Sequence, residues 1–369
     1  MSCPVSCARN CDVSSVGVAQ PRLSGVRCGM VACIAVLFLL GGCAQVDYLL
    51  QSAQGHLALL AARQPIAQLI DDPSTSAALA QRLGQVNDIR AFARDELGLP
   101  DQGSYQDYVD LQRPHVLYSV SAAPPLSLTP RHWCYPIVGC VSYRGFFQLR
   151  RASDEAAFFR AQGDDVYVAP VQAYSTLGWF DDPVISTLLS GPNWYTASVI
   201  FHELTHQQLY IADDTAFNEA YAVAVQREGE RRWLARHSDT AQREQYARYH
   251  STQEQFLTLV RSTRHELATL YASPIDDAAK RLRKQELFTR MRARFVQLRS
   301  NWGGYRGFDR WFAQDLNNAK MALVATYNDL VPRFATLLVE LGGDMPEFHR
   351  RVAQLASLPK QQRRDALPR

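Results

Sequence analysis

Residues 199–206 of this chain read VIFHELTH, and residues 218–222 read NEAYA. On a helix, side chains four residues apart lie on one face, so His202 and His206 would point the same way with Glu203 beside them. Most other positions of the first segment are apolar, which predicts a buried helix. Because buried imidazoles and carboxylates need polar partners, the segment predicts a buried helix that carries a metal site.

A metal ion bound by two histidines of one helix needs a further protein ligand, and Glu219 is the first candidate. The segment 211–215 has the composition of a turn, and its Asp or Thr residues could cap a following helix. An antiparallel return of the chain would then bring Glu219 opposite His206. Asp213 and Asp214, within the turn itself, are the alternative ligands.

The two segments together resemble the gluzincin aminopeptidases, in which a helix with Asn-Glu followed by small and aromatic residues supplies a glutamate ligand. More specifically, the chain looks like the bacterial "putative aminopeptidase" lipoprotein family. The stretches that carry this likeness are WCYPIVGCVSYRGFF (133–147), AYSTLGWFDDP (173–183), the segment 199–234, and NNAKMALVATYNDLVPRF (317–334).

The resemblance implies a bound Zn²⁺ with three protein ligands, His202, His206 and Glu219. Glu203 would be the general base that takes a proton from a metal-bound water, and then the acid that protonates the leaving amine. Gluzincin aminopeptidases also use a tyrosine to stabilise the oxyanion. Tyr305 is the first candidate for that role here, and Tyr327 is the second.

The implied function is zinc-dependent hydrolysis of peptide bonds near the N-terminus of a peptide substrate. Aminopeptidases of this kind hold the substrate's free amine with acidic groups, but their usual Gly-x-Met-Glu-Asn strand motif does not occur in this sequence. Asp181 and Asp182 could take that role, although Asp-Asp before a proline is also typical of a turn. An envelope endopeptidase with the same chemistry, and a non-catalytic lipoprotein scaffold with a vestigial zinc site, are the alternatives.

The N-terminal region predicts export and lipid anchoring. Residues 30–40 (MVACIAVLFLL) form an apolar run of signal-peptide length, with Arg22 and Arg27 before it. The following Leu-Gly-Gly-Cys-Ala resembles a lipobox, which implies cleavage and lipidation at Cys43. Residues 1–42 are therefore expected to be a signal peptide with an extra leader before Arg22. The mature protein would face the periplasm from the outer membrane of a bacterial envelope.

Two cysteines, Cys134 and Cys140, lie in the body of the chain, away from the N-terminal group. In an oxidising compartment this spacing predicts a short-loop disulfide, the alternative being two buried thiols.

The balance of basic and acidic residues argues against a nucleic-acid-binding protein. The 39 basic and 36 acidic residues leave a net charge of +3, whereas nucleic-acid binding usually needs a concentrated basic face. The oligomeric state is not indicated.

The sequence predicts a mainly α protein with a small β portion, an α+β fold, and the resemblance adds a zincin or gluzincin-like metallopeptidase architecture. Residues 43–369 would form the lipid-anchored, mostly helical metallopeptidase domain. Its strand-containing part is expected at about 114–192, and its zinc-site helices at about 195–237. Apolar periodicity predicts long helices at 195–210, 215–237, 240–272 and 276–300.

Overall fold

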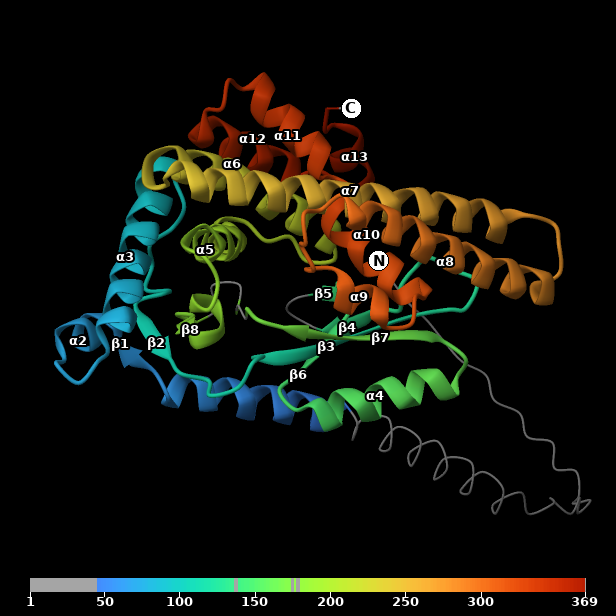
Figure 1. Ribbon diagram of the computed structural model, residues 1–369, viewed down its shortest axis with the longest axis horizontal. Helices are drawn as coiled ribbons and strands as arrows, with labels where there is room; N and C mark the ends of the chain where they lie inside the picture. The colour runs from blue at the N-terminus through green and yellow to red at the C-terminus, as the bar shows by residue number, and fades with distance from the viewer. Residues whose placement is uncertain (1–44, 136–138, 174–175, 177–179, 369) are drawn as a thin grey trace, which may run out of the picture. The chain divides into compact units, whose positions relative to one another are not determined.

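The computed structural model describes residues 45–135, 139–173, 176 and 180–368 (Figure 1). By its internal contacts the chain divides into two compact units, residues 1–51 and 52–369. Of the first unit the structure describes residues 45–51, which are helical. The predicted signal peptide and Cys43 lie outside the described residues. Among the helices that are described, none is long and apolar enough to cross a bilayer.

The second unit is mainly helical, as the sequence predicted. It starts with helical residues 52–61 and continues with α2 (Ile66–Asp71), α3 (Ala77–Leu97), α4 (Leu149–Ala161), α5 (Asn193–Gln208), α6 (Thr215–His237), α7 (Thr240–Ala272), α8 (Asp277–Ser300), α9 (Asp309–Ala313), α10 (Asn318–Asn328), α11 (Val331–Glu340), α12 (Met345–Ala356) and α13 (Lys360–Asp365). Capping side chains define several of the boundaries. Asp239 accepts a hydrogen bond from the Gln242 amide at the start of α7, and Ser76 accepts one from the Leu79 amide at the start of α3.

The small β portion includes an antiparallel sheet of three strands in the order β6-β3-β7. Its strands are β3 (Leu117–Ala123), β6 (Arg144–Phe146) and β7 (Asp165–Val171). Both α4 and α10 pack against β3 and β7, and Figure 1 shows them on opposite faces of the sheet. Because both faces of the sheet are covered, most of β3 is buried.

Two further strand groups are shorter. One pairs β1 (Gln64–Pro65) with β2 (Asp107–Val109), and β2 in turn with β8 (Val184–Ile185). The other is a hairpin of β4 (Trp133–Tyr135) and β5 (Gly139–Val141), in which Cys134 lies opposite Cys140. The strands predicted before the motif helix are therefore present, although they belong to three small sheets in the described part of the chain.

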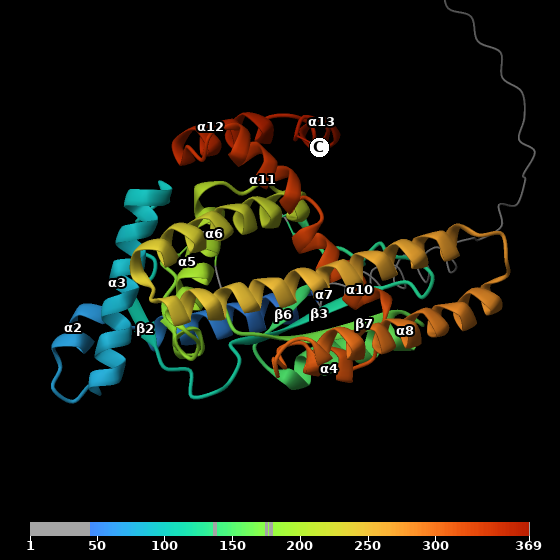
Figure 2. The ribbon, with the colours of Figure 1, turned by 45° about the horizontal axis from the view of Figure 1, so that its top comes forward.

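The main apolar core lies among α3, α5, α6, α11 and α12, and a second cluster lies between α7, α8 and the segment 302–321. Figure 2 shows α8 running beside the C-terminal part of α7. Gly229 allows α5 and α6 to pack closely. A Cβ at this position would lie 2.5 Å from a ring carbon of Phe201 and 2.7 Å from a methyl carbon of Leu97. The absence of a side chain at Gly229 therefore allows the close packing of the two helices that carry the candidate metal ligands.

Candidate metal centre

Helix α5 presents His202 and His206 one turn apart. The apolar residues of the helix, among them Ile200, Phe201 and Leu204, are buried in the main core. This burial fixes the rotation of α5 and directs both imidazoles toward α6. The two rings are 4.9 Å apart between centroids, and their Nε2 atoms are 3.2 Å apart.

A short turn reverses the chain between α5 and α6, and Asn218 closes it. The Asn218 side chain accepts a hydrogen bond from the Ile211 amide at 3.0 Å and donates one to the Ile211 carbonyl at 2.8 Å. Asp213 takes a positive φ of 65°, a conformation that Asp tolerates better than most residues. Because Glu219 follows Asn218 directly on α6, closing the turn brings its carboxylate opposite the two histidines.

The side chains of His202, His206 and Glu219 meet at one point and could hold a metal ion. Glu219 Oε2 lies 3.2 Å from His202 Nε2 and 3.6 Å from His206 Nε2. His206 and Glu219 are 4% and 7% exposed. Two imidazole nitrogens and a carboxylate oxygen that converge at these distances, largely away from solvent, could hold a metal ion through three ligands.

The electrostatics of the three residues also favour a bound cation. Burial by itself would lower the pKa of His202, but the hydrogen bond to Glu219 and the charges of Glu203 and Glu219 raise it to about 9. Burial would raise the pKa of Glu219, whereas the charge of His206 and hydrogen bonds from both histidines lower it to about 2. A buried carboxylate thus needs a positive partner here, and a metal ion would replace the imidazolium proton in that role.

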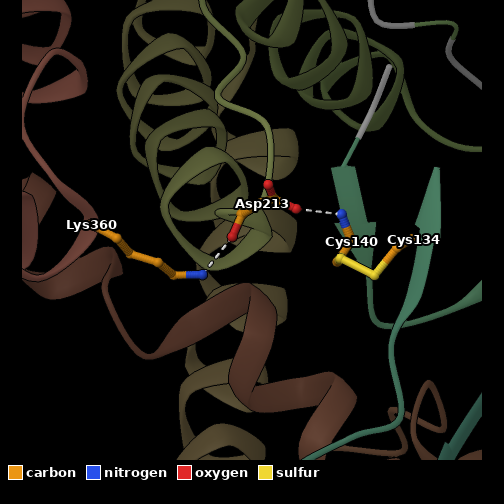
Figure 3. The surroundings of a disulfide bond; sticks show 4 residues. All are labelled: Cys134, Cys140, Asp213 and Lys360. Carbon is orange, nitrogen blue, oxygen red and sulfur yellow. Dashed lines mark hydrogen bonds between the residues drawn. A yellow bond between two sulfur atoms is a disulfide. The ribbon is translucent and has the colours of Figure 1, made fainter. Parts of the chain in front are cut away.

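The alternative ligands, Asp213 and Asp214, make contacts elsewhere. Figure 3 shows Asp213 between Lys360 and the Cys134–Cys140 disulfide. Its Oδ1 accepts a hydrogen bond from the Cys140 amide at 2.6 Å, and its carbonyl accepts one from Lys360 Nζ.

Asp214 precedes α6 and is 1% exposed. Its carboxylate accepts hydrogen bonds from Arg363 at 2.6 Å and from Arg364 at 3.2 Å. Both aspartates therefore connect the turn between the two ligand helices to its neighbours, the disulfide hairpin on one side and α13 on the other. Glu219, and neither aspartate, completes the group that could hold a metal.

Comparison with known protein families gives one match over most of the chain. The model of the family described as "Putative aminopeptidase" matches residues 47–367. The chain belongs to this aminopeptidase family. No curated protein and no solved structure matches it. Family membership supports peptidase activity at a general level. The matched residues include His202, His206 and Glu219, which are called the metal group below because they could hold a metal ion.

Glu203 lies beside the metal group in a half-buried position on α5. Its charge acts on Tyr105, whose pKa is raised well above its ordinary value, first by burial and then by Glu203 and Asp182. Tyr105 is 2% exposed and has a positive φ of 62°, which is uncommon for a residue with a bulky side chain. Its amide donates to the Asp182 carbonyl at 2.6 Å, which holds this strained residue in place near Glu203.

Of the tyrosines described near the candidate ligands, Tyr210 was not expected from the sequence. The Tyr305 ring packs against Tyr249, Trp302 and Phe308 in the second apolar cluster. The side chain of Tyr327 lies outside the described part of the chain. The ring of Tyr210 lies 6.2 Å from that of His206, and burial together with the charges of Glu219 and Asp213 raises its pKa. The role of Tyr305 stays a prediction, and Tyr210 is a neutral phenol next to the metal group.

Asp181 and Asp182, considered for binding a substrate amine, have different environments. Asp182 is 1% exposed, and its Oδ2 accepts a hydrogen bond from the Thr176 amide at 2.9 Å. Its own amide donates to Ser104 Oγ at 3.1 Å. Asp181 is exposed, and its carbonyl accepts a hydrogen bond from Arg63. Asp182 therefore connects Thr176 and Ser104, and Asp181 is the more accessible of the two carboxylates.

A buried polar cluster that was not predicted from the sequence lies behind His202. Gln226 Oε1 lies 3.1 Å from His202 Nδ1, and Gln226 Nε2 donates to Ser198 Oγ at 2.8 Å and to Glu230 Oε1 at 2.9 Å. Helical spacing could have pointed to this cluster. Gln226 and Glu230 are four apart on α6, and Ser198 and His202 are four apart on α5, so each pair lies on one helix face.

Proposed function

We propose that this protein is a zinc-dependent aminopeptidase, with His202, His206 and Glu219 as the zinc ligands. The choice of zinc rests on the spacing of the three ligand atoms. The three ligand atoms lie 3.2, 3.2 and 3.6 Å apart. Zinc bonds of about 2.0–2.2 Å in a tetrahedral arrangement would separate the ligand atoms by about 3.3–3.6 Å. The spacing therefore suits zinc without a large rearrangement.

The number of ligands favours a catalytic site over a structural one. Structural zinc sites usually have four protein ligands, whereas catalytic sites have three and leave a position open. Bound zinc would supply a Lewis acid that polarises the scissile carbonyl and makes water more acidic. This count argues against the alternative of a non-catalytic scaffold.

Glu203 is the proposed general base. It would take a proton from the attacking water and donate it to the leaving amine. Its place beside His202 on α5, half-buried next to Tyr105, supports this role. Tyr305 is the oxyanion candidate that the resemblance suggests, and Tyr210, a neutral phenol beside His206, is the hydrogen-bond donor that the structure supports better.

The purified protein tests this function through its metal content and its choice of peptides. We expect one zinc per chain, measured by elemental mass spectrometry, and cleavage of peptides with free N-termini but not of N-acetylated ones. Cleavage of acetylated peptides would instead identify an endopeptidase. Bound zinc without any cleavage would favour the scaffold, and a protein without affinity for zinc would contradict the proposal.

We further propose that the protein is anchored in the bacterial envelope, at the outer membrane facing the periplasm, by lipid on Cys43. The support is the apolar run 30–40 followed by Leu-Gly-Gly-Cys. Cys43→Ser should move the protein from the membrane fraction to the soluble fraction and abolish incorporation of labelled palmitate. Cys33→Ser, a matched change within the apolar run, should leave both unchanged. Unchanged fractionation of Cys43→Ser would show that another feature anchors the chain.

A further inference from the structure

The buried cluster behind His202 is centred on the carboxylate of Glu230, which is 1% exposed. Four donors from three helices surround this carboxylate. Ser198 Oγ and Gln226 Nε2 donate to its Oε1, while Tyr246 and His250 of α7 lie 2.7 and 3.0 Å from its Oε2. A carboxylate buried among so many donors is an acceptor at both oxygens. The contacts with Tyr246 and His250 also connect α7 to the metal-site helices.

The acceptor character of Glu230 determines how the Gln226 amide is oriented. A carboxylate can only accept, so the end of the amide facing Glu230 must be the NH₂ group. The carbonyl end of Gln226 then faces His202 Nδ1 at 3.1 Å. A carbonyl oxygen can only accept, so His202 must carry a proton on Nδ1. The chemistry of one buried carboxylate thus assigns the tautomer of a candidate ligand two hydrogen bonds away.

Because Nδ1 of His202 carries the proton, Nε2 is the nitrogen of this side chain that remains to bind a metal. This atom faces the other two ligand atoms, at 3.2 Å from both Glu219 Oε2 and His206 Nε2. His206 has no equivalent support, since its buried Nδ1 makes no hydrogen bond with the part of the chain that the structure describes. The protein therefore orients one of the two candidate ligand histidines, His202, with a dedicated hydrogen-bond chain.

We propose that Gln226 and Glu230 are positioning residues that hold His202 with its proton on Nδ1 and its Nε2 directed at the metal. The proposal rests on the function proposed above, because it assigns these residues to the same metal site. Partners of this kind behind a ligand fix the orientation of its ring and raise its basicity. Gln226 acts directly on the ligand, and Glu230 acts through Gln226.

Zinc affinity of the full-length protein, measured by competition with a chelator, gives the first test. Gln226→Leu removes the acceptor for His202 and should weaken zinc binding by about 10- to 100-fold. Glu230→Gln keeps the shape of the side chain but can present either end of its amide to Gln226, so it should also weaken binding. Glu228→Gln is the matched control. Glu228 lies on the same helix but pairs with Arg231 and Arg232, and its replacement should leave zinc affinity unchanged.

An exchange of the two groups separates positioning from general packing. In Gln226→Glu/Glu230→Gln, the new carboxylate at 226 accepts from His202 and Ser198. The new amide at 230 donates to it and accepts from Tyr246 and His250. The double variant should therefore bind zinc more tightly than Glu230→Gln and close to the wild type. Thermal unfolding of the metal-free proteins reports any loss of stability separately, and a merely structural role would lower stability without changing zinc affinity.

The His202 proton can also be observed without metal. With ¹⁵N-labelled histidine, the spectrum of the wild type should contain a slowly exchanging Nδ1 proton that disappears in Gln226→Leu. An unprotonated Nδ1 in the wild type, or wild-type zinc affinity in Gln226→Leu, would overturn the proposal. Failure of the wild type to bind zinc while this proton is present would contradict the proposed function and leave the hydrogen-bond chain intact.

Discussion

Replacement of Glu203 by glutamine should abolish most peptide hydrolysis while zinc stays bound. The amide keeps the size and polarity of the side chain but cannot accept a proton from the attacking water. General acid–base catalysis contributes about 10²- to 10⁴-fold to a rate, so kcat should fall by at least about that factor. The three candidate ligands, His202, His206 and Glu219, are unchanged in this variant, and its metal content should equal that of the wild type.

Initial rates on a peptide with a free N-terminus, together with the zinc content of the same sample, provide the measurement. Glu254→Gln is the matched control, because Glu254 is a half-exposed glutamate of α7 that pairs with Arg227. It should retain wild-type activity. If Glu203→Gln hydrolyses peptides at the wild-type rate, Glu203 is not the base and another group must accept the proton.

Glu219→Ala should lose zinc. The substitution removes the only carboxylate of the group that could hold a metal and leaves two histidines of α5. Loss of a direct ligand should weaken binding by more than the roughly 10- to 100-fold expected for a residue behind a ligand. The zinc dissociation constant, obtained by chelator competition, is the quantity to compare, and peptide hydrolysis should disappear with the metal.

Asp213→Ala is the control for that variant, because Asp213 is one of the two alternative ligands in the turn. Its carboxylate accepts a hydrogen bond from the Cys140 amide, so its loss should leave zinc affinity nearly unchanged. If zinc is lost from Asp213→Ala and kept by Glu219→Ala, the third ligand must be reassigned to the turn.

In the metal-free state, the stability of Glu219→Ala should depend on pH differently from that of the wild type. In the metal-free wild type the pKa of His202 is raised from 6.5 to about 9. The stabilisation from its protonation is complete below 6.5 and is lost as pH rises through about 9. Unfolding by urea should show this loss in the wild type. Without Glu219, burial still opposes protonation of His202 and only Glu203 and Gln226 still raise its pKa, so the dependence over this interval should become smaller. An undiminished dependence would assign it to another group.

The long helices were predicted closely because apolar residues recur in them at helical spacing over many turns. The expected segments 215–237 and 240–272 have the same boundaries as α6 and α7, and 195–210 is displaced by two residues from α5. A pattern of apolar residues that repeats over several turns is a strong local signal. Capping residues such as Asp239 add another signal at the ends.

The short strands could not be predicted in the same way. Strands β1, β2 and β8 contain two or three residues each, too few to show an alternating pattern. They pair residues far apart in the chain, as in the parallel alignment of Tyr108 with Val184. Only the packing of the surrounding elements decides such pairings, because no local preference favours one distant partner over another.

The candidate ligands were accessible to sequence reasoning because their geometry is mostly local. The spacing of His202 and His206 follows from one helix, and the place of Glu219 follows from one turn. The tyrosine is harder to predict, and the role of Tyr305 stays a prediction. Tyr305 packs in the second apolar cluster, while the ring of Tyr210, just after α5, lies 6.2 Å from that of His206. Which tyrosine lies near the candidate ligands depends on where separate helices end in space.

The sequence by itself determined the helices, the two histidines with Glu203 beside them, and the most suitable third ligand, since these depend on helical periodicity and on one short connection. The tertiary structure alone decided what surrounds that group. The close packing of α5 and α6 at Gly229, and the contact of Glu230 with α7, bring Gln226 behind His202. Hydrogen bonds between helices depend on the register and separation of those helices, and the packing of the whole core sets both.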